Sequence, residues 1–229
     1  MECRPDPAAC CGLKPVRPVV FDCDGVLVDS GFAWIGALEH ALHGYGMVVD
    51  GRVTASMIGG SVPEAIEYLS DTLDRELDRT AISKEIYDDV LSRLALGVQA
   101  MDGAGELLER LNGTRALAIA SNGSCETVEA SIRSAGLPRV FDVVVALDGT
   151  LRPKPAPDLY IEACAQLGTP CGDAIAFEDS LRGAASARSA GLSVIGVGQE
   201  TRLHGVCDLV VASLRDDRLP AFLEAPTLG

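Results

Sequence analysis

The feature that most constrains the fold is a recurring alternation of short, continuously apolar runs with longer amphipathic stretches. Six such runs occur, at residues 18–23, 115–121, 141–146, 174–177, 193–197 and 208–211. Runs without polar alternation are typical of strands that are buried on both faces of a parallel sheet. The stretches between them space apolar residues as a helix does, for example at Leu107, Leu108 and Leu111. We therefore expect an α/β fold, with a doubly wound, Rossmann-like parallel sheet covered by helices.

One long stretch, between the first and second runs, departs from this alternation. Residues 31–97 show helical periodicity only, in apolar stripes at Ile35/Leu38/Leu42/Tyr45, Val62/Ile66/Leu69/Leu73 and Ile82/Ile86/Val90/Leu94. The stretch enters where the first strand ends, which is the edge where open α/β sheets bind their ligands. We predict a helical cap domain at 31–97, a core domain formed by 18–30 and 98–229, and a flexible leader at 1–17.

Charge and composition restrict the partners that the chain can have. There are 19 basic and 33 acidic residues, for a net charge of −14, which argues against a nucleic acid or an anionic membrane as the partner. No apolar run reaches the roughly 18 residues of a membrane-spanning helix, and the N-terminus lacks the apolar stretch of a secretory signal. The eight cysteines include no CxxC pair, which favours reduced thiols and a cytoplasmic location.

The first apolar run ends in two carboxylates, Asp22 and Asp24, and Gly25 follows them. A carboxylate at the end of a buried strand costs free energy unless it is paired or bound to a metal. Taken alone, the segment could equally be an Asp-Gly turn in which the acids are incidental. Other evidence is needed to decide between these interpretations.

That evidence comes from three further strand ends, which carry Ser121-Asn122-Gly123, Lys154 between two prolines, and Glu178-Asp179. Each has a structural explanation by itself: a helix cap, an exposed loop and an acid-rich helix start. Together they place hard oxygen ligands suited to Mg²⁺ beside a hydroxyl, turn amides and an ammonium group suited to a phosphoryl group. None of the three histidines follows a strand end, so a carboxylate is the natural nucleophile.

With these motifs the chain resembles the haloacid dehalogenase superfamily. The resemblance covers about residues 18–212, and the motifs follow the order of that family: Asp22-Cys-Asp24-Gly25-Val26, Ser121-Asn122, Lys154-Pro155 and Glu178-Asp179. The runs FDCDGVLVDS and KPAPDLY resemble the branch with a helical cap after the first motif. That branch includes β-phosphoglucomutase, phosphoglycolate phosphatase and sugar-phosphate phosphatases.

The resemblance implies a role for each motif. Asp22 would attack phosphorus and form an aspartyl-phosphate, and Asp24 would act as general acid and base. Ser121 and Lys154 would hold phosphoryl oxygens. Mg²⁺ would be bound by Asp22, by the backbone carbonyl of Asp24 and by Glu178 and Asp179. The implied activity is a Mg²⁺-dependent phosphatase for a small phosphorylated metabolite, such as a sugar phosphate or a similar monophosphate.

The cap and the second motif supply the candidate substrate-binding residues, which are Trp34, Gly59, Gly60, Ser61 and Asn122. For Trp34, a role in the cap core is the alternative. In β-phosphoglucomutase the positions aligned with Trp34, Ile58 and Val62 carry His, Lys and Arg. This chain has none of the three charged residues at these positions. Hydrolysis is therefore favoured. The alternatives are a phosphoryl-transferring mutase and a non-catalytic binding module on the same fold.

Overall fold

The computed structural model describes residues 16–47, 60–74, 76–147, 149–199 and 201–225. Its core sheet contains six strands, all of which lie within or overlap the predicted apolar runs: β1 (Val19–Phe21), β4 (Leu117–Ser121), β5 (Val143–Ala146), β6 (Ile175–Glu178), β7 (Ser193–Val197) and β8 (Leu209–Val211). The strands are parallel and lie in the order β5-β4-β1-β6-β7-β8. The predicted α/β class is confirmed. The strand order reverses at β1, which places the ligand-binding edge at the carboxyl end of this strand.

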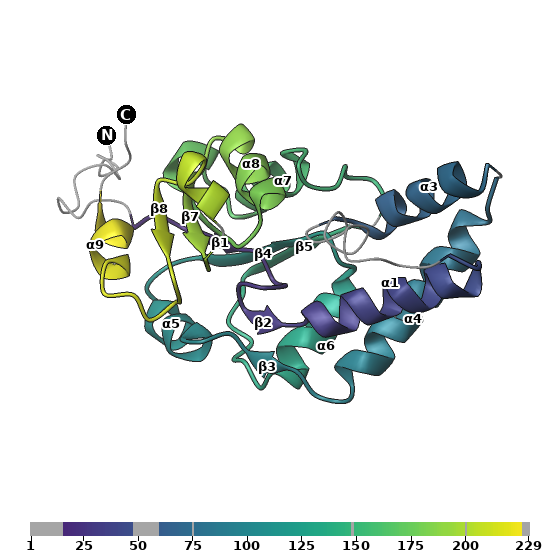
Figure 1. The fold of residues 1–229 in the computed structure, drawn as a ribbon. Coiled ribbons are helices and arrows are strands. Elements are labelled where there is room, and N and C mark those ends of the chain that lie inside the picture. The colour runs from purple at the N-terminus through teal and green to yellow at the C-terminus, as the bar shows by residue number, and fades with distance from the viewer. Residues whose placement is uncertain (1–15, 48–59, 75, 148, 200, 226–229) are drawn as a thin grey trace, which may run out of the picture.

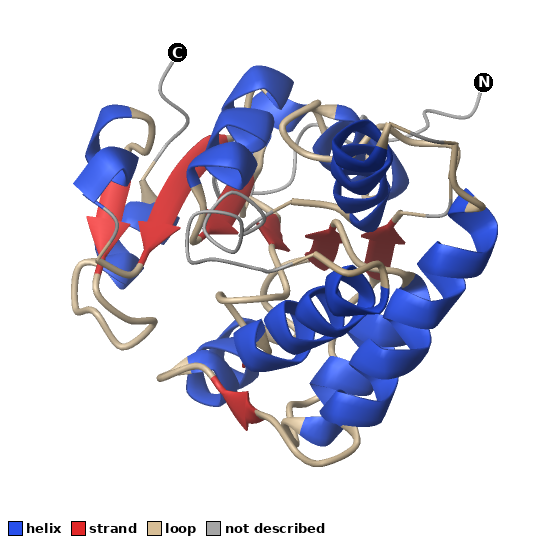
Figure 2. Ribbon diagram, turned by 45° about the vertical axis from the view of Figure 1, so that its right-hand side comes forward, coloured by secondary structure: helices blue, strands red, loops and turns tan. Residues whose placement is uncertain are grey.

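Helices cover both faces of the sheet (Figure 1, Figure 2). On one face lie α7 (Asp158–Gln166) and α8 (Leu181–Ala190), and on the other lie α5 (Ala104–Leu111) and α6 (Cys125–Ser134). The side chains of β1 alternate between these layers: Val20 packs with α7 and α8, whereas Val19 and Phe21 pack with α5 and α6. A helix on each face explains why the strand is apolar at every position.

The segment between β1 and β4 forms the predicted helices. They are α1 (Gly31–Gly44), α3 (Val62–Leu73) and α4 (Arg79–Leu94), and they lie to one side of the sheet (Figure 1). The described residues of 31–97 form helices and turns and no strand. Local sequence fixes where α3 begins, because the Ser61 side chain caps the helix and the Glu64 side chain bonds back to the Ser61 amide.

A short antiparallel ladder, which the sequence did not predict, joins the two crossings to this helical segment. β2 (Val28–Asp29) pairs with β3 (Gln99–Ala100). The ladder brings both ends of the helical segment together beside the end of β1. The domain boundaries at 30/31 and 97/98 stay a prediction.

The remaining described elements are short: η2 (Cys171–Asp173), η3 (Thr201–Gly205) and α9 (Leu219–Glu224). None of the helices in the described ranges combines the length and the apolarity needed to cross a bilayer. The predicted leader falls almost wholly outside the described residues.

Candidate active site

The four sequence motifs meet at the carboxyl end of β1. Asp22 follows this strand directly, and its amide donates to the carbonyl of Phe177 in β6 at 2.9 Å. This bond sets the first motif beside the fourth. Gly25 has a φ of +89°, and a Cβ at this position would overlap the carboxylate of Asp179. Only glycine therefore permits both the turn and the close approach of Asp179.

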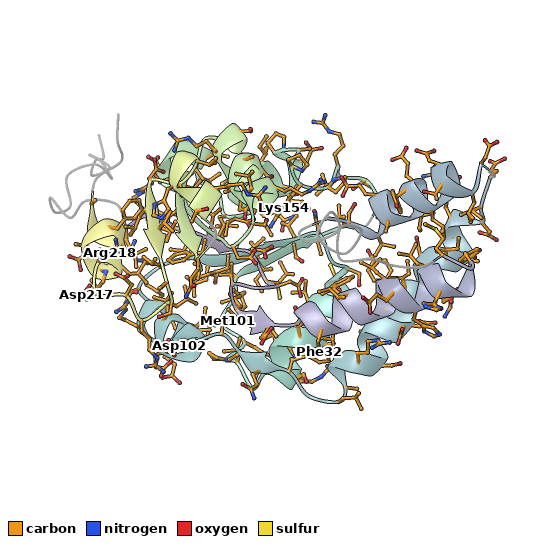
Figure 3. The ribbon with its side chains drawn as sticks, viewed as in Figure 1. Phe32, Met101, Asp102, Lys154, Asp217 and Arg218 are labelled. Carbon is orange, nitrogen blue, oxygen red and sulfur yellow. The ribbon has the colours of Figure 1, made fainter. Side chains whose placement is uncertain are left out.

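Lys154 lies at the centre of the site, on the side of the core that faces the cap helices (Figure 3). Its Nζ donates to Asp22 Oδ1 at 2.6 Å and to Glu178 Oε1 at 2.6 Å. Only 3% of Lys154 is exposed, so its charge is compensated by carboxylates rather than by water. Burial by itself lowers the pKa of Lys154, but the attraction of Asp22 and Glu178 outweighs burial and raises it above its ordinary value.

Two further contacts fix this arrangement. The backbone amide of Lys154 donates to Asn122 Oδ1 at 2.9 Å, which ties the third motif to the second. The phenol of Tyr160 donates to Glu178 Oε1 at 2.5 Å. Glu178 is fully buried, and this burial raises its pKa to about 7, although Lys154 opposes the shift.

Asp24 occupies a different environment from Asp22. Its Oδ1 accepts hydrogen bonds from the Ser30 hydroxyl at 2.5 Å and from Trp34 Nε1 at 2.9 Å. Its Oδ2 faces the Ser121 hydroxyl at 3.5 Å. Burial, and then the charge of Asp22, raise the pKa of Asp24, while the two donors partly offset that rise. A carboxyl group that holds its proton above its usual range is suited to general acid catalysis.

A metal ion fits the acidic side of the site. One carboxylate oxygen from each of Asp22, Glu178 and Asp179 lies within 4.8 Å of the others. The pKa of Asp179 is raised well above its ordinary value, by burial first and then by repulsion from Asp22 and Glu178. A set of hard oxygen donors that repel one another is the donor set that Mg²⁺ accepts. The side chain of Asp24 is engaged elsewhere, so its part in this set rests on the predicted backbone carbonyl.

Of the other predicted site residues that the structure describes, four line the cavity and one is buried beneath it. Trp34, Gly60, Ser61 and Asn122 line the cavity next to the carboxylates, and Asn122 Nδ2 donates to the Gly60 carbonyl at 3.4 Å. Ser121 is fully buried and is not among the lining residues; its hydroxyl accepts the Gly123 amide at 3.0 Å. Gly59 and Ile58 lie outside the described residues.

Sequence reasoning missed four residues that hold the site together: Ser30, Glu64, Tyr160 and Arg182. Ser30 and Tyr160 belong to the two runs that carry the family resemblance, and that position could have drawn attention to them. Arg182, on α8, forms an ion pair with Glu64 on α3 and donates to the Lys154 carbonyl at 3.2 Å. Glu64 and Arg182 are 118 residues apart in the sequence, and no local pattern joins them.

A cavity of about 630 Å³ opens over these groups, between the core and the helical segment. The core contributes Asp22, Asp24, Lys154 and Asp179, and the helical segment contributes residues of α1 and α3. The volume is that of a site for a small molecule. The arrangement offers a nucleophile, a proton donor, a cation and a metal-binding set to one ligand.

Comparison with known proteins agrees with this geometry. Among solved structures, CbbY from Rhodobacter sphaeroides in complex with phosphate is 26% identical, has a TM-score of 0.77, and the match covers 88% of this chain and 96% of that one. A β-phosphoglucomutase from Clostridium difficile, with a TM-score of 0.81 over 91% and 97% of the two chains, is 20% identical and supports the fold alone.

Several curated relatives carry phosphatase names. The bifunctional riboflavin kinase/FMN phosphatase of Arabidopsis thaliana is 30% identical over 88% of this chain, which spans 54% of that longer protein. The fructose-1-phosphate phosphatase YqaB of Escherichia coli is 26% identical, over 78% of this chain and 95% of its own length. Residues 19–197 match the family described as haloacid dehalogenase-like hydrolase. The resemblance seen in the motifs is thus confirmed, and the chain belongs to the haloacid dehalogenase-like hydrolase family.

Proposed function

We propose that this protein is a Mg²⁺-dependent phosphoric monoester hydrolase that cleaves a small phosphorylated metabolite through an aspartyl-phosphate. The observation that carries the proposal is the position of Lys154, 2.6 Å from both Asp22 and Glu178, with Asp24 held separately by Ser30 and Trp34. The two aspartates thus have the different environments that a nucleophile and an acid require.

In the first step an Asp22 oxygen attacks phosphorus, and the bond between phosphorus and the ester oxygen breaks. Asp24 gives its proton to the departing alcohol oxygen. Lys154 offsets the negative charge that gathers as a carboxylate approaches a phosphate dianion. The ion pair between Lys154 and Asp22 keeps the positive charge next to the attacking carboxylate.

In the second step a water molecule attacks phosphorus, and the bond between phosphorus and the Asp22 oxygen breaks. Asp24, now ionised, takes the proton of the water. The products are inorganic phosphate and the restored Asp22 carboxylate and Asp24 acid. The protein thus returns to its starting state without a further reactant.

Asp22, Glu178 and Asp179, with the Asp24 backbone carbonyl, are the groups that would hold Mg²⁺. When bound, the ion supplies positive charge that lets a carboxylate and a phosphate dianion come together. The Asp179 pKa supports this assignment, because burial with Asp22 and Glu178 disfavours the ionised carboxylate unless a cation is present.

The relatives support the class of reaction. The names of several, including the phosphorylated carbohydrates phosphatase of Thermotoga maritima, describe phosphatases of small phosphorylated molecules. We also propose that residues 31–97 act as a cap that encloses the substrate. The cavity between this segment and the core, and the short ladder at its base, support that role.

Substitution of the two aspartates tests the function. Asp22→Asn and Asp24→Asn should each lower phosphate release from monophosphates by more than about 10³-fold, because each removes a group that the chemistry needs. Both variants should keep the thermal midpoint of the wild type or exceed it, since each replaces an acid of a crowded acidic site by a neutral amide. Asp217→Asn, which alters an exposed carboxylate far from the site, is the control and should keep full activity. Wild-type turnover by Asp22→Asn would disprove the mechanism.

A further inference from the structure

Away from the reacting groups, the cavity is lined mainly by apolar side chains. We call this region the apolar arm and define it by Ile35, Leu38 and Leu42 of α1, Ala65 and Tyr68 of α3, and Met101. The three α1 residues recur at helical spacing and so present one face. Figure 3 labels Met101 beside β2, where the cap segment meets the core.

The charged groups near the arm do not favour a second anion. The described cap residues that line the cavity carry two charges, both negative, on Glu39 and Glu64. Among the described lining residues Arg182 is the remaining cation besides Lys154, and its Nη2 is paired with Glu64. Lys154 is already bonded to Asp22 and Glu178.

Among the described residues, the polar partners that the arm offers to hydroxyl groups are the Tyr68 phenol and the neighbouring Glu39 carboxylate. The Ser61 side chain, at its entrance, is taken up by the cap of α3 through Glu64. Val62, which begins α3, is 2% exposed and adds another apolar wall. A polyhydroxylated body that entered here would lose more hydrogen bonds to water than these two groups can replace, which is unfavourable.

We propose that the enzyme prefers monophosphates whose alcohol carries an uncharged, mainly apolar body, and that this body occupies the apolar arm. The inference rests on the proposed phosphatase function and narrows it: such substrates are preferred to sugar phosphates and bisphosphates. Apolar surface removed from water supplies the binding free energy, and the phosphoryl group remains at Asp22.

A matched pair of substrates tests the preference. Cyclohexylmethyl phosphate and glucose 6-phosphate are both primary alkyl esters on a six-membered ring, so the reacting centre is nearly the same. With Mg²⁺ present, kcat/KM should be at least tenfold higher for cyclohexylmethyl phosphate. An equal or higher value for glucose 6-phosphate would overturn the inference. So would a preference for 2-phosphoglycolate, which would point to Arg182 as a carboxylate site.

The activated ester p-nitrophenyl phosphate tests the phosphatase function separately from the preference for an apolar body. If it is hydrolysed and the cyclohexyl compound has no advantage, the apolar arm fails while the phosphatase function stands. If none of these esters releases phosphate, the proposed function fails, and the inference fails with it.

A variant locates the preference in the arm. Leu38→Gln should lower kcat/KM for cyclohexylmethyl phosphate at least fivefold without a comparable loss for glucose 6-phosphate, because the amide can bond to the hydroxyls of the sugar. Leu91→Gln is the matched control, because Leu91 is also a partly buried cap leucine but does not line the cavity; it should leave the ratio of the two substrates unchanged. If Leu38→Gln does not fold, as judged by its thermal melt, Met101→Gln takes its place. An equal loss for both substrates would overturn the assignment.

Discussion

Asp24 receives two hydrogen bonds that act against the effect of its burial. Burial and the Asp22 charge raise its pKa, while Ser30 and Trp34 lower it by stabilising the ionised carboxylate. Trp34→Phe removes one donor and keeps an aromatic ring. The pKa of Asp24 should therefore rise further, so that the acid stays protonated to higher pH. With a hydrogen bond to a charged group contributing about 1.5 kcal/mol, the expected displacement is roughly one pH unit.

The measurement is the pH dependence of kcat at saturating Mg²⁺. In Trp34→Phe the alkaline limb of this profile should move to higher pH. Tyr87→Phe is the control, since the Tyr87 ring packs edge-on against Trp34 with centroids 6.1 Å apart but does not contact Asp24. A limb that stays in place, or moves to lower pH, would show that Trp34 does not tune the acid.

At the scale of elements, α3 and α8 are joined by the ion pair between Glu64 and Arg182. Both side chains are more than a third exposed, so the pair should contribute only about 0.5 kcal/mol. A double-mutant cycle with Glu64→Gln and Arg182→Ala should give a coupling of about twofold in kcat/KM, because the pair holds the cap segment near the core. The cycle of Arg152 and Asp158, a pair that joins the loop before α7 to the first residue of that helix, should give none. Zero coupling between Glu64 and Arg182 would show that this ion pair does not position the cap segment.

Most elements follow from local patterns in the sequence, and the exceptions have physical causes. Strand 193–197 is observed with the predicted bounds, because its burial on both faces leaves a continuous apolar run. β2 and β3 contain two residues each, too few to show any period. The carboxylate motifs could be predicted because acids at the end of a buried strand are costly. The donation from Trp34 to Asp24 could not, because an indole on an apolar helix face suits a core equally well.

For the whole molecule, the acidic site makes stability depend on pH when no metal is bound. Glu178, with a pKa raised to about 7, and Asp179 keep their protons in the folded protein at pH values where the unfolded chain has lost them. The folded state thus binds more protons, and its stability is present at lower pH and lost as pH rises toward 7 and above. In excess chelator, the thermal midpoint should decrease as the pH is raised from 5.5 to 7.5.

Mg²⁺ should reverse that loss. At a concentration of about 100 times its Kd, an ion that binds only the folded state stabilises it by about 2.7 kcal/mol, or roughly 5–10 °C for a chain of this size. Thermal melts with and without Mg²⁺ at pH 7.5 measure the difference. Asp179→Asn should melt above the wild type in chelator and gain little from Mg²⁺. A metal-free wild type that becomes more stable as the pH rises from 5.5 to 7.5 would contradict the account.

Trp34 is the only tryptophan among the 229 residues, and its indole N–H is bonded to Asp24. The tryptophan fluorescence of the whole protein therefore comes from a single ring, which joins the helical segment to the acid of the active site. Its emission depends on that one hydrogen bond and on the water around the cavity. The protein thus carries a built-in optical reporter, with which ligand entry could be followed in real time without any attached label.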